Sequence, residues 1–179
     1  MEFFELTEKR RSIRSYDETK PVTREQIEKI IYAAQQAPSW KNRQASRYYC
    51  LMTGEKHDLF CKACLPERNA QKAVGAALVV TTFVKNVVGF SEDGKTADNE
   101  CGNGWGYYDL GLASENICLA AKDIGLDSLI MGLRDGEKIR EFLSLPEDEQ
   151  VVSVIAIGHG TSSPEKPERK ELSDVLKFI

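Results

Sequence analysis

Two continuous apolar runs constrain the fold of this chain more than any other feature. They cover residues 78–84 and 151–157 and consist mainly of β-branched and other apolar residues. A strand with one face in water alternates apolar and polar residues, so a continuous run indicates a strand buried on both faces. We therefore expect these runs in the interior of a sheet that is surrounded by helices.

Helical patterns lie between and around these runs. Thr23 followed by Gln26 matches a capping box, and apolar residues then recur at helical spacing up to Pro38. Small and apolar residues at many positions of 105–124 predict a long helix packed on more than one side. Further helices are expected at residues 2–10, 55–65, 69–76 and 135–143, and further strands at 48–52 and 126–131.

The composition narrows the class of protein. A chain of 179 residues, 41% hydrophobic and 29% charged, is typical of one globular domain spanning residues 1–179, here of α+β pattern with four or five strands. The net charge of −4 argues against a non-specific nucleic-acid partner. No apolar run approaches the roughly 20 residues that span a bilayer, and no secretory leader is apparent. We expect a cytoplasmic protein with no membrane partner.

Residues 86–104 differ in character from the rest of the chain. Gly89, Gly94, Gly102 and Gly104 are scattered among acidic and amide residues. This pattern predicts the least structured part of the molecule, an excursion that acts as a lid or entry loop.

The five cysteines include a C-x-x-C pair, Cys61 and Cys64. His57 lies four residues before Cys61, so the three side chains could share a helix face as metal ligands, or the thiols could form a redox pair. The small apolar residues around the pair favour simple packing instead. A thiol or metal protein centred here remains one alternative, although we assign no metal ligands.

Three arginines and a serine lie within five residues at Arg10, Arg11, Ser12 and Arg14. Guanidinium groups match the paired oxygens of phosphate and the hydroxyl adds a donor, so this cluster is a candidate phosphate clamp. The alternative is a solvated charged surface. A second basic cluster, Lys166, Arg169 and Lys170, precedes an apolar terminus that needs a surface to dock on.

Four motifs occur in a specific order along the chain. They are Arg-Arg-Ser-Ile-Arg-Ser-Tyr at 10–16, Ala-Pro-Ser with Asn-x-Gln at 37–44, Asp-x-Gly-x-Ala to Gly-Leu at 109–126, and Ile-x-Ile-Gly with Arg-Lys-x-Leu at 155–172. Together they resemble the nitroreductase family of FMN flavoproteins. The resemblance runs nearly end to end, apart from residues 86–104.

The resemblance implies a fold and a function. The expected fold is a mostly antiparallel sheet of four to five strands flanked by helices, in an intertwined homodimer with FMN at the interface. The expected activity is that of an FMN-dependent oxidoreductase, in which NADH or NADPH reduces the flavin and a nitroaromatic, quinone or related conjugated acceptor then reoxidises it. Flavin N5 would carry the chemistry in this ping-pong cycle, so no catalytic side chain is assigned.

The resemblance also assigns phosphate-side residues. Arg10 and Ser12 would face the FMN phosphate, with Arg11 in the same run. Arg169 and Lys170 would join them from the tail.

Further residues would contact the flavin ring. Arg14 would lie near N1 and O2, where a cation stabilises the negative charge that reduction adds. Asn69 would hydrogen-bond the ring. Met131 and Gly132 occupy the segment whose backbone N–H meets N5; the family often has proline or glutamate there, but a backbone contact tolerates the change.

Pro38, Ser39, Trp40 and Asn42 match the loop that reaches the flavin from the other subunit. The family usually has a small residue at the position of Trp40, so this indole is expected to reshape the substrate pocket or to pack the dimer.

Alternatives within the same fold are a specialised flavin enzyme, such as a dehalogenase or flavin-consuming enzyme, and a non-catalytic FMN-binding dimer. The sequence leaves open the natural acceptor and the preference between NADH and NADPH.

Overall fold

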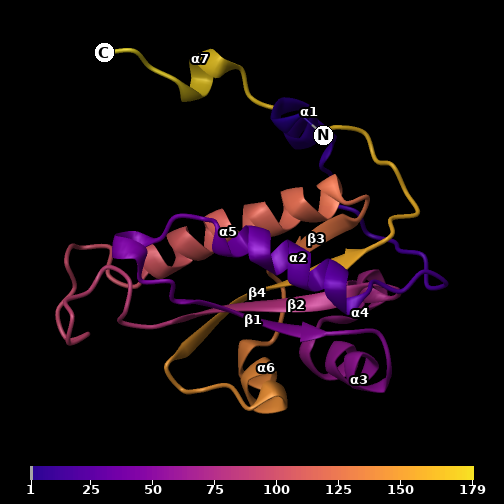
Figure 1. Cartoon of the computed structure of the whole chain (residues 1–179), viewed down its shortest axis with the longest axis horizontal. Coiled ribbons are helices and arrows are strands. Elements are labelled where there is room, and N and C mark those ends of the chain that lie inside the picture. Colours follow the sequence, from indigo (N-terminus) through magenta and orange to yellow (C-terminus); the bar gives the residue numbers. More distant parts are fainter. Residues whose placement is uncertain (1) are drawn as a thin grey trace.

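The computed structural model describes residues 2–179, and within them it contains one sheet of four antiparallel strands (Figure 1). The strand order is β1-β2-β4-β3, with every neighbouring pair antiparallel. The predicted α+β class with a mostly antiparallel sheet is confirmed. The strands are β1 Ser46–Leu51, β2 Ala77–Val84, β3 Asp127–Met131 and β4 Glu149–Gly158.

Helices cover both faces of this sheet. The predicted capping box of α2 is confirmed, because the Thr23 hydroxyl accepts from Gln26 N–H at 3.2 Å and Gln26 Oε1 accepts from Thr23 N–H at 2.9 Å. The helices are α1 Phe3–Lys9, α2 Arg24–Gln35, α3 Glu55–Cys64, α4 Glu67–Ala73, α5 Gly104–Asp123, α6 Gly136–Leu143 and α7 Leu172–Val175, with a short 3₁₀ turn, η1 Trp40–Asn42.

The central strands β2 and β4 are buried on both faces, as their apolar runs predict. Leu78 and Val80 point into a core with α3, α4 and α6, whereas Ala77 and Val79 point into a second core with α2 and α5. Figure 1 shows α2 and α5 on one side of the sheet and α3 and α6 on the other. The two cores therefore fix the sheet between two helical layers.

The segment that follows α1 runs along the free edge of β3. Ser12 pairs in parallel with Ser128 of β3, and Ile13 N–H donates to the Ser128 carbonyl at 3.0 Å. Buried Tyr16 then lies directly against Gly158, where an added Cβ would be 2.7 Å from the ring. The N-terminal basic cluster is thus anchored at this edge.

Residues 86–104 contain no regular helix or strand before α5 begins at Gly104, in line with the expected irregular segment. They are nevertheless well held. Asn86 N–H donates to Asn103 Oδ1 at 2.8 Å, and Asn103 Nδ2 donates to Asn86 Oδ1 at 2.9 Å, so the two ends are joined. A role as a lid stays a prediction.

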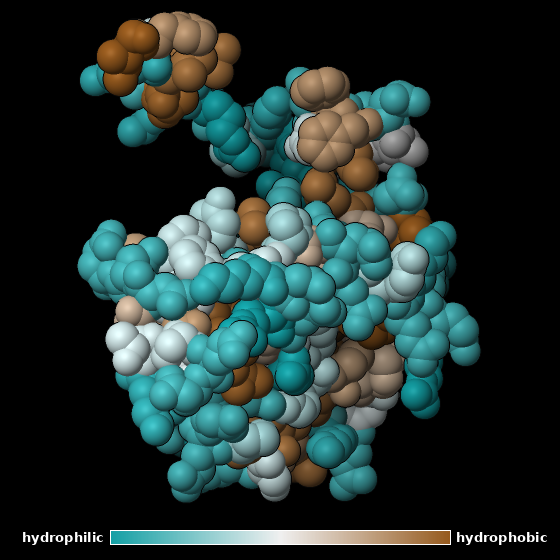
Figure 2. Space-filling view, turned by 60° about the vertical axis from the view of Figure 1, so that its left-hand side comes forward, coloured by the Kyte–Doolittle hydropathy of each residue, from teal (hydrophilic) through white to brown (hydrophobic). Residues whose placement is uncertain are grey.

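The C-terminal tail after residue 160 is exposed throughout and carries α7 away from the main body (Figure 1). Leu172 is 73% exposed and Phe178 is 92% exposed. Figure 2 shows these apolar side chains gathered on the tail, separated from the body by a hollow. Across residues 2–179, none of the helices is both long and apolar enough to cross a membrane.

Candidate functional site

The three arginines of the N-terminal cluster have different surroundings. Arg10 Nε lies 3.7 Å from Glu115 Oε1 of α5, and Arg14 Nη1 donates to the Ser12 carbonyl at 3.0 Å. Arg11 Nη1 instead donates to the carbonyls of Glu8 and Arg10. Arg11 therefore serves the last turn of α1, which would otherwise leave its carbonyls unpaired.

Helix α4 brings further cations to Arg14. Burial lowers the pKa of Lys72, and the positive charges of Arg68 and Arg14 lower it further. Among the described residues, none of these three cations forms an ion pair within 4.0 Å. Like charges held together without carboxylates create a local positive potential that suits an anion.

Sequence reasoning missed Arg68 and Lys72 because they are far from Arg14 along the chain. A signal was present, since Lys72 lies three residues after Asn69 and such residues share one face of a helix.

Asn69 joins α4 to the segment that follows β3. Its side chain is buried, and Nδ2 donates to the Leu133 carbonyl at 2.8 Å. Met131 is buried at the end of β3, and an added Cβ on Gly132 would meet nothing within 4 Å. The fold therefore gathers three separate predicted segments at one edge of the sheet. We call residues 10–14, 68–72 and 131–132 the β3-edge group.

The second predicted segment is the 38–44 loop, between α2 and β1. Its backbone is held by Trp40 N–H, which donates to Asp109 Oδ2 at 2.8 Å, and by Gln44 N–H, which donates to Ser39 Oγ at 3.1 Å. Burial raises the pKa of Asp109 above its ordinary value, and the hydrogen bond from Trp40 offsets part of that effect.

Three residues of this loop have left-handed backbones. The φ angles are 48° at Lys41, 54° at Asn42 and 49° at Gln44. A left-handed conformation costs a residue other than glycine about 1–2 kcal/mol, and such residues are concentrated at functional sites. The surrounding contacts must therefore hold the loop in this shape.

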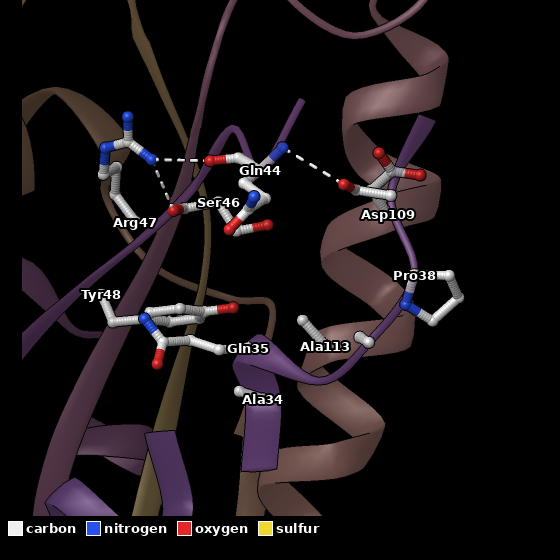
Figure 3. A pocket seen from close by; sticks show the side chains of 11 residues that line it. Ala34, Gln35, Pro38, Gln44, Ser46, Arg47, Tyr48, Asp109 and Ala113 are labelled. Atoms are coloured by element: carbon white, nitrogen blue, oxygen red, sulfur yellow. Dashed lines mark hydrogen bonds between the residues drawn. The ribbon is translucent and has the colours of Figure 1, made fainter. Parts of the chain in front are cut away.

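A cavity of about 300 Å³ lies beside the loop (Figure 3). In Figure 3, Asp109 and Ala113 approach it from α5, Pro38 from the loop and Tyr48 from β1. This mixture of polar and apolar groups suits a small ligand. The lining residues are Ala34, Gln35, Ala37, Pro38, Ser39, Gln44, Ser46, Arg47, Tyr48, Asp109 and Ala113.

The loop and the β3-edge group are not brought together within one chain. The loop leads into β1, and β1 and β3 form opposite edges of the sheet. A second copy of the chain could bring its own loop to the β3-edge group of the first. This separation agrees with the prediction that the loop acts from the other subunit, but the dimer itself stays a prediction.

The predicted tail residues Arg169 and Lys170 are exposed. Arg169 Nη1 donates to the Pro167 carbonyl at 3.1 Å, and nearby Lys166 lies 3.8 Å from Glu8 of α1. The tail thus passes beside α1, the helix that ends just before Arg10. Its contribution to the site stays a prediction.

The C-x-x-C pair packs in the core between α3 and its neighbours. Cys61 Sγ lies 3.8 Å from His57 Nε2 and 4.0 Å from Nδ1, so it faces the ring and not one nitrogen lone pair. Burial raises the pKa of both Cys61 and Cys64 to about 11. Within the described residues no cluster of potential ligands is arranged for a metal. The burial of both thiols favours the packing interpretation of the pair.

Comparison with known proteins places the chain in a family. The family model described as Nitroreductase family matches residues 7–159. A "Putative NADH dehydrogenase/NAD(P)H nitroreductase" of Archaeoglobus fulgidus is 30% identical over 159 residues, which cover 84% of this chain and 80% of the relative. An "FMN reductase [NAD(P)H]" of Bacillus subtilis is 30% identical over 88% of this chain and 66% of that protein.

The likeness extends to three dimensions. A crystal structure of a nitroreductase family protein from Clostridium difficile superimposes with a TM-score of 0.79 and 26% identity, covering 99% of this chain and 98% of the other. The geometry defines a class of α+β protein. Such a protein has a basic group at one edge of its sheet and a loop with left-handed residues at the opposite edge. The chain belongs to the nitroreductase family.

Proposed function

We propose that this protein is a homodimeric enzyme that passes electrons from NADH or NADPH, through FMN, to a nitroaromatic, quinone or related conjugated acceptor. Its family and its relatives make it an NAD(P)H-dependent flavin oxidoreductase with FMN as cofactor. The acceptor class and the dimer are the parts that we propose.

One observation carries the proposal: cations gather on the β3-edge group with no carboxylate paired to Arg14, Arg68 or Lys72 in the described structure. FMN has an anionic phosphate and gains negative charge on its pyrimidine edge when reduced. The residues of the β3-edge group therefore suit both the phosphate and the pyrimidine edge of FMN.

Each part of the β3-edge group has a proposed task. Arg10 and Ser12 hold the phosphate, while Arg14 and Lys72 present positive charge to the pyrimidine edge. Asn69, whose Nδ2 is committed to Leu133, offers its oxygen to a ring N–H. Bound FMN supplies the two-electron chemistry, and the protein supplies orientation and electrostatics. Met131 and Gly132 contribute backbone groups at the end of β3.

The separation of the two site segments supports the dimer. A second copy would bring its 38–44 loop to the β3-edge group of the first and complete the cofactor pocket. The exposed apolar tail, including Leu172 and Phe178, offers the surface that such a partner would cover. The expected cytoplasmic location stays a prediction.

The first experiment is an absorption spectrum of the purified protein, followed by NADH or NADPH without oxygen. We expect a flavin spectrum that bleaches, and that returns when a nitroaromatic or a quinone is added. A control incubated without nicotinamide should keep its colour. A protein that takes up no FMN, or whose bound FMN neither nicotinamide reduces, would overturn the proposed function.

A further inference from the structure

The 86–104 excursion and the start of α5 each make one contact with the 38–44 loop. Lys41 Nζ lies 3.0 Å from Asp98 Oδ2, and the Trp40 ring packs on Trp105, with 4.6 Å between ring centroids and 47° between planes. Trp105 follows the excursion in the first turn of α5. The two contacts therefore join the loop to a segment roughly sixty residues further along the chain.

The excursion is held firmly enough to act as a support. The reciprocal bonds of Asn86 and Asn103 close its base, and Asp98 N–H donates to the Gly89 carbonyl at 2.8 Å. Gly89 has φ of 73°, and an added Cβ there would lie 2.6 Å from Trp105 Cδ1. Asp98 and Trp105 are thus fixed relative to one another through the same glycine.

The loop has an internal hydrogen bond from Gln44 N–H to Ser39 Oγ, but two of its side chains also rely on contacts outside it. Lys41 and Asn42 have left-handed backbones, and the Lys41 side chain finds its ion-pair partner in the excursion. The Trp40 backbone is held by Asp109, but its indole rests on Trp105. Loss of the excursion contacts would free the loop to relax toward ordinary backbone conformations.

We propose that Asp98 and Trp105 are positioning residues for the cofactor, which hold the 38–44 loop in the shape that contacts FMN without touching FMN themselves. The inference rests on the proposed function, because that function makes the loop a flavin contact. With Asp98 and Trp105 in this role, the affinity for FMN depends on the excursion. This role differs from that of a lid over the substrate.

The ion pair gives the cleanest test. Asp98→Asn keeps the size of the side chain but removes its charge, and an exposed pair is worth a modest amount, so we expect FMN to bind about two- to fivefold more weakly. The reversed pair Lys41→Glu with Asp98→Lys should restore most of that affinity, which a general loss of folding would not do. Glu92→Gln, an exposed carboxylate of the same excursion, is the matched control and should bind FMN as the wild type does.

The indole stack gives a second, independent test. Trp105→Ala should weaken FMN binding about tenfold, whereas Trp105→Phe keeps an aromatic partner for Trp40 and should lose much less. Thermal unfolding and circular dichroism of the FMN-free proteins would check that the variants fold. If Trp105→Ala fails to fold, the ion-pair variants still decide the matter.

The outcomes separate this inference from the proposed function. If the wild-type protein binds no FMN, the proposed function fails. If the wild type binds FMN and both Asp98→Asn and Trp105→Ala bind it equally well, the function stands and the positioning role is overturned. A loss in Asp98→Asn that the reversed pair does not restore would overturn the role of the ion pair.

Discussion

The three arginines within residues 10–14 have separate tasks in this protein. Arg10 lies near Glu115 on α5, Arg11 donates to carbonyls at the end of α1, and the charge of Arg14 acts on Lys72 of α4. Position along the sheet edge, and not residue type, decides which of them can meet the phosphate and which the ring. Their substitutions should therefore have different consequences.

Arg10→Ala should weaken FMN binding about 10- to 100-fold, because a charge-assisted hydrogen bond to phosphate would be lost. Arg14→Ala should mainly lower the midpoint potential of the bound flavin, since the cation stabilises the reduced, negatively charged ring. Flavin fluorescence titration gives the dissociation constant, and anaerobic titration against a reference dye gives the potential.

Arg24→Ala is the control for these arginines. Arg24 pairs with Glu28 on the surface of α2, so its removal should change neither quantity. Equal FMN affinity in Arg10→Ala and the wild type would refute the phosphate assignment.

Asp109 gives a prediction about pH. Burial raises the pKa of this carboxyl above its ordinary 3.8. The folded state then holds the proton more firmly than the unfolded chain, so this stabilising contribution is complete below the unfolded pKa and is lost as pH rises through the folded pKa. Asp109→Asn keeps an acceptor for Trp40 N–H without the charge, and its stability relative to the wild type should therefore rise over this interval.

Urea unfolding at several values between about pH 3 and 7 would measure that difference. Asp148→Asn removes an exposed carboxylate and serves as the control, with no comparable rise. A difference between Asp109→Asn and the wild type that stays constant or falls with pH would contradict the argument.

At the scale of elements, the contact between α5 and β2 depends on a glycine. Gly106 is buried, and an added Cβ would lie 2.4 Å from two carbons of the Phe83 ring. That ring also packs edge-on against Tyr107, so it has little freedom to move away. Gly106→Ala should therefore lower the free energy of unfolding by about 1–3 kcal/mol.

Gly104→Ala is a matched control in the same turn of α5. Its Cβ would meet Cys101 Cβ at 3.7 Å, an ordinary contact, so stability should change by less than about 0.5 kcal/mol. Chemical unfolding of both variants, at the same FMN content, would make the comparison. Similar losses in the two variants would show that steric conflict with Phe83 is not the cause.

Elements with strong patterns were predictable from the sequence, and those without were not. β2 and β4 followed from their apolar runs because both faces are buried. β1 begins earlier than expected, since Ser46 and Arg47 are polar yet pair with β2. The turn η1 went unnoticed because Lys41 and Asn42 adopt left-handed backbones without a glycine to signal them.

The candidate site was predictable only in part for a related reason. Resemblance to a family supplied residue roles that periodicity alone could not. Neither revealed that the charges of Arg14 and Arg68 act on Lys72, because the position of Lys72 relative to Arg14 depends on how α4 packs over the sheet. The coupling of Asp98 to Lys41 was equally hidden, as it joins two irregular segments. Long-range packing decides such contacts, and local sequence carries little information about it.

At the scale of the whole molecule, two features remain without a partner inside one chain. The 38–44 loop and the β3-edge group lie at opposite edges of the sheet. The tail holds apolar side chains in water, including Leu172, Val175, Leu176 and Phe178. One intertwined dimer would resolve both, because a second copy can complete the site and cover the tail together.

Removing residues 172–179 should therefore convert a dimer into a monomer and abolish tight FMN binding, while the circular dichroism of the main body stays nearly unchanged. Each large apolar side chain that becomes fully buried contributes about 1.5–3 kcal/mol, so losing the five of this segment would weaken association by several orders of magnitude. Analytical ultracentrifugation with and without FMN would measure both effects. Asp174→Ala with Lys177→Ala alters only polar side chains of the same segment and should remain dimeric. A truncated chain that is still a dimer with bound FMN would show that the tail is not what holds the two copies together.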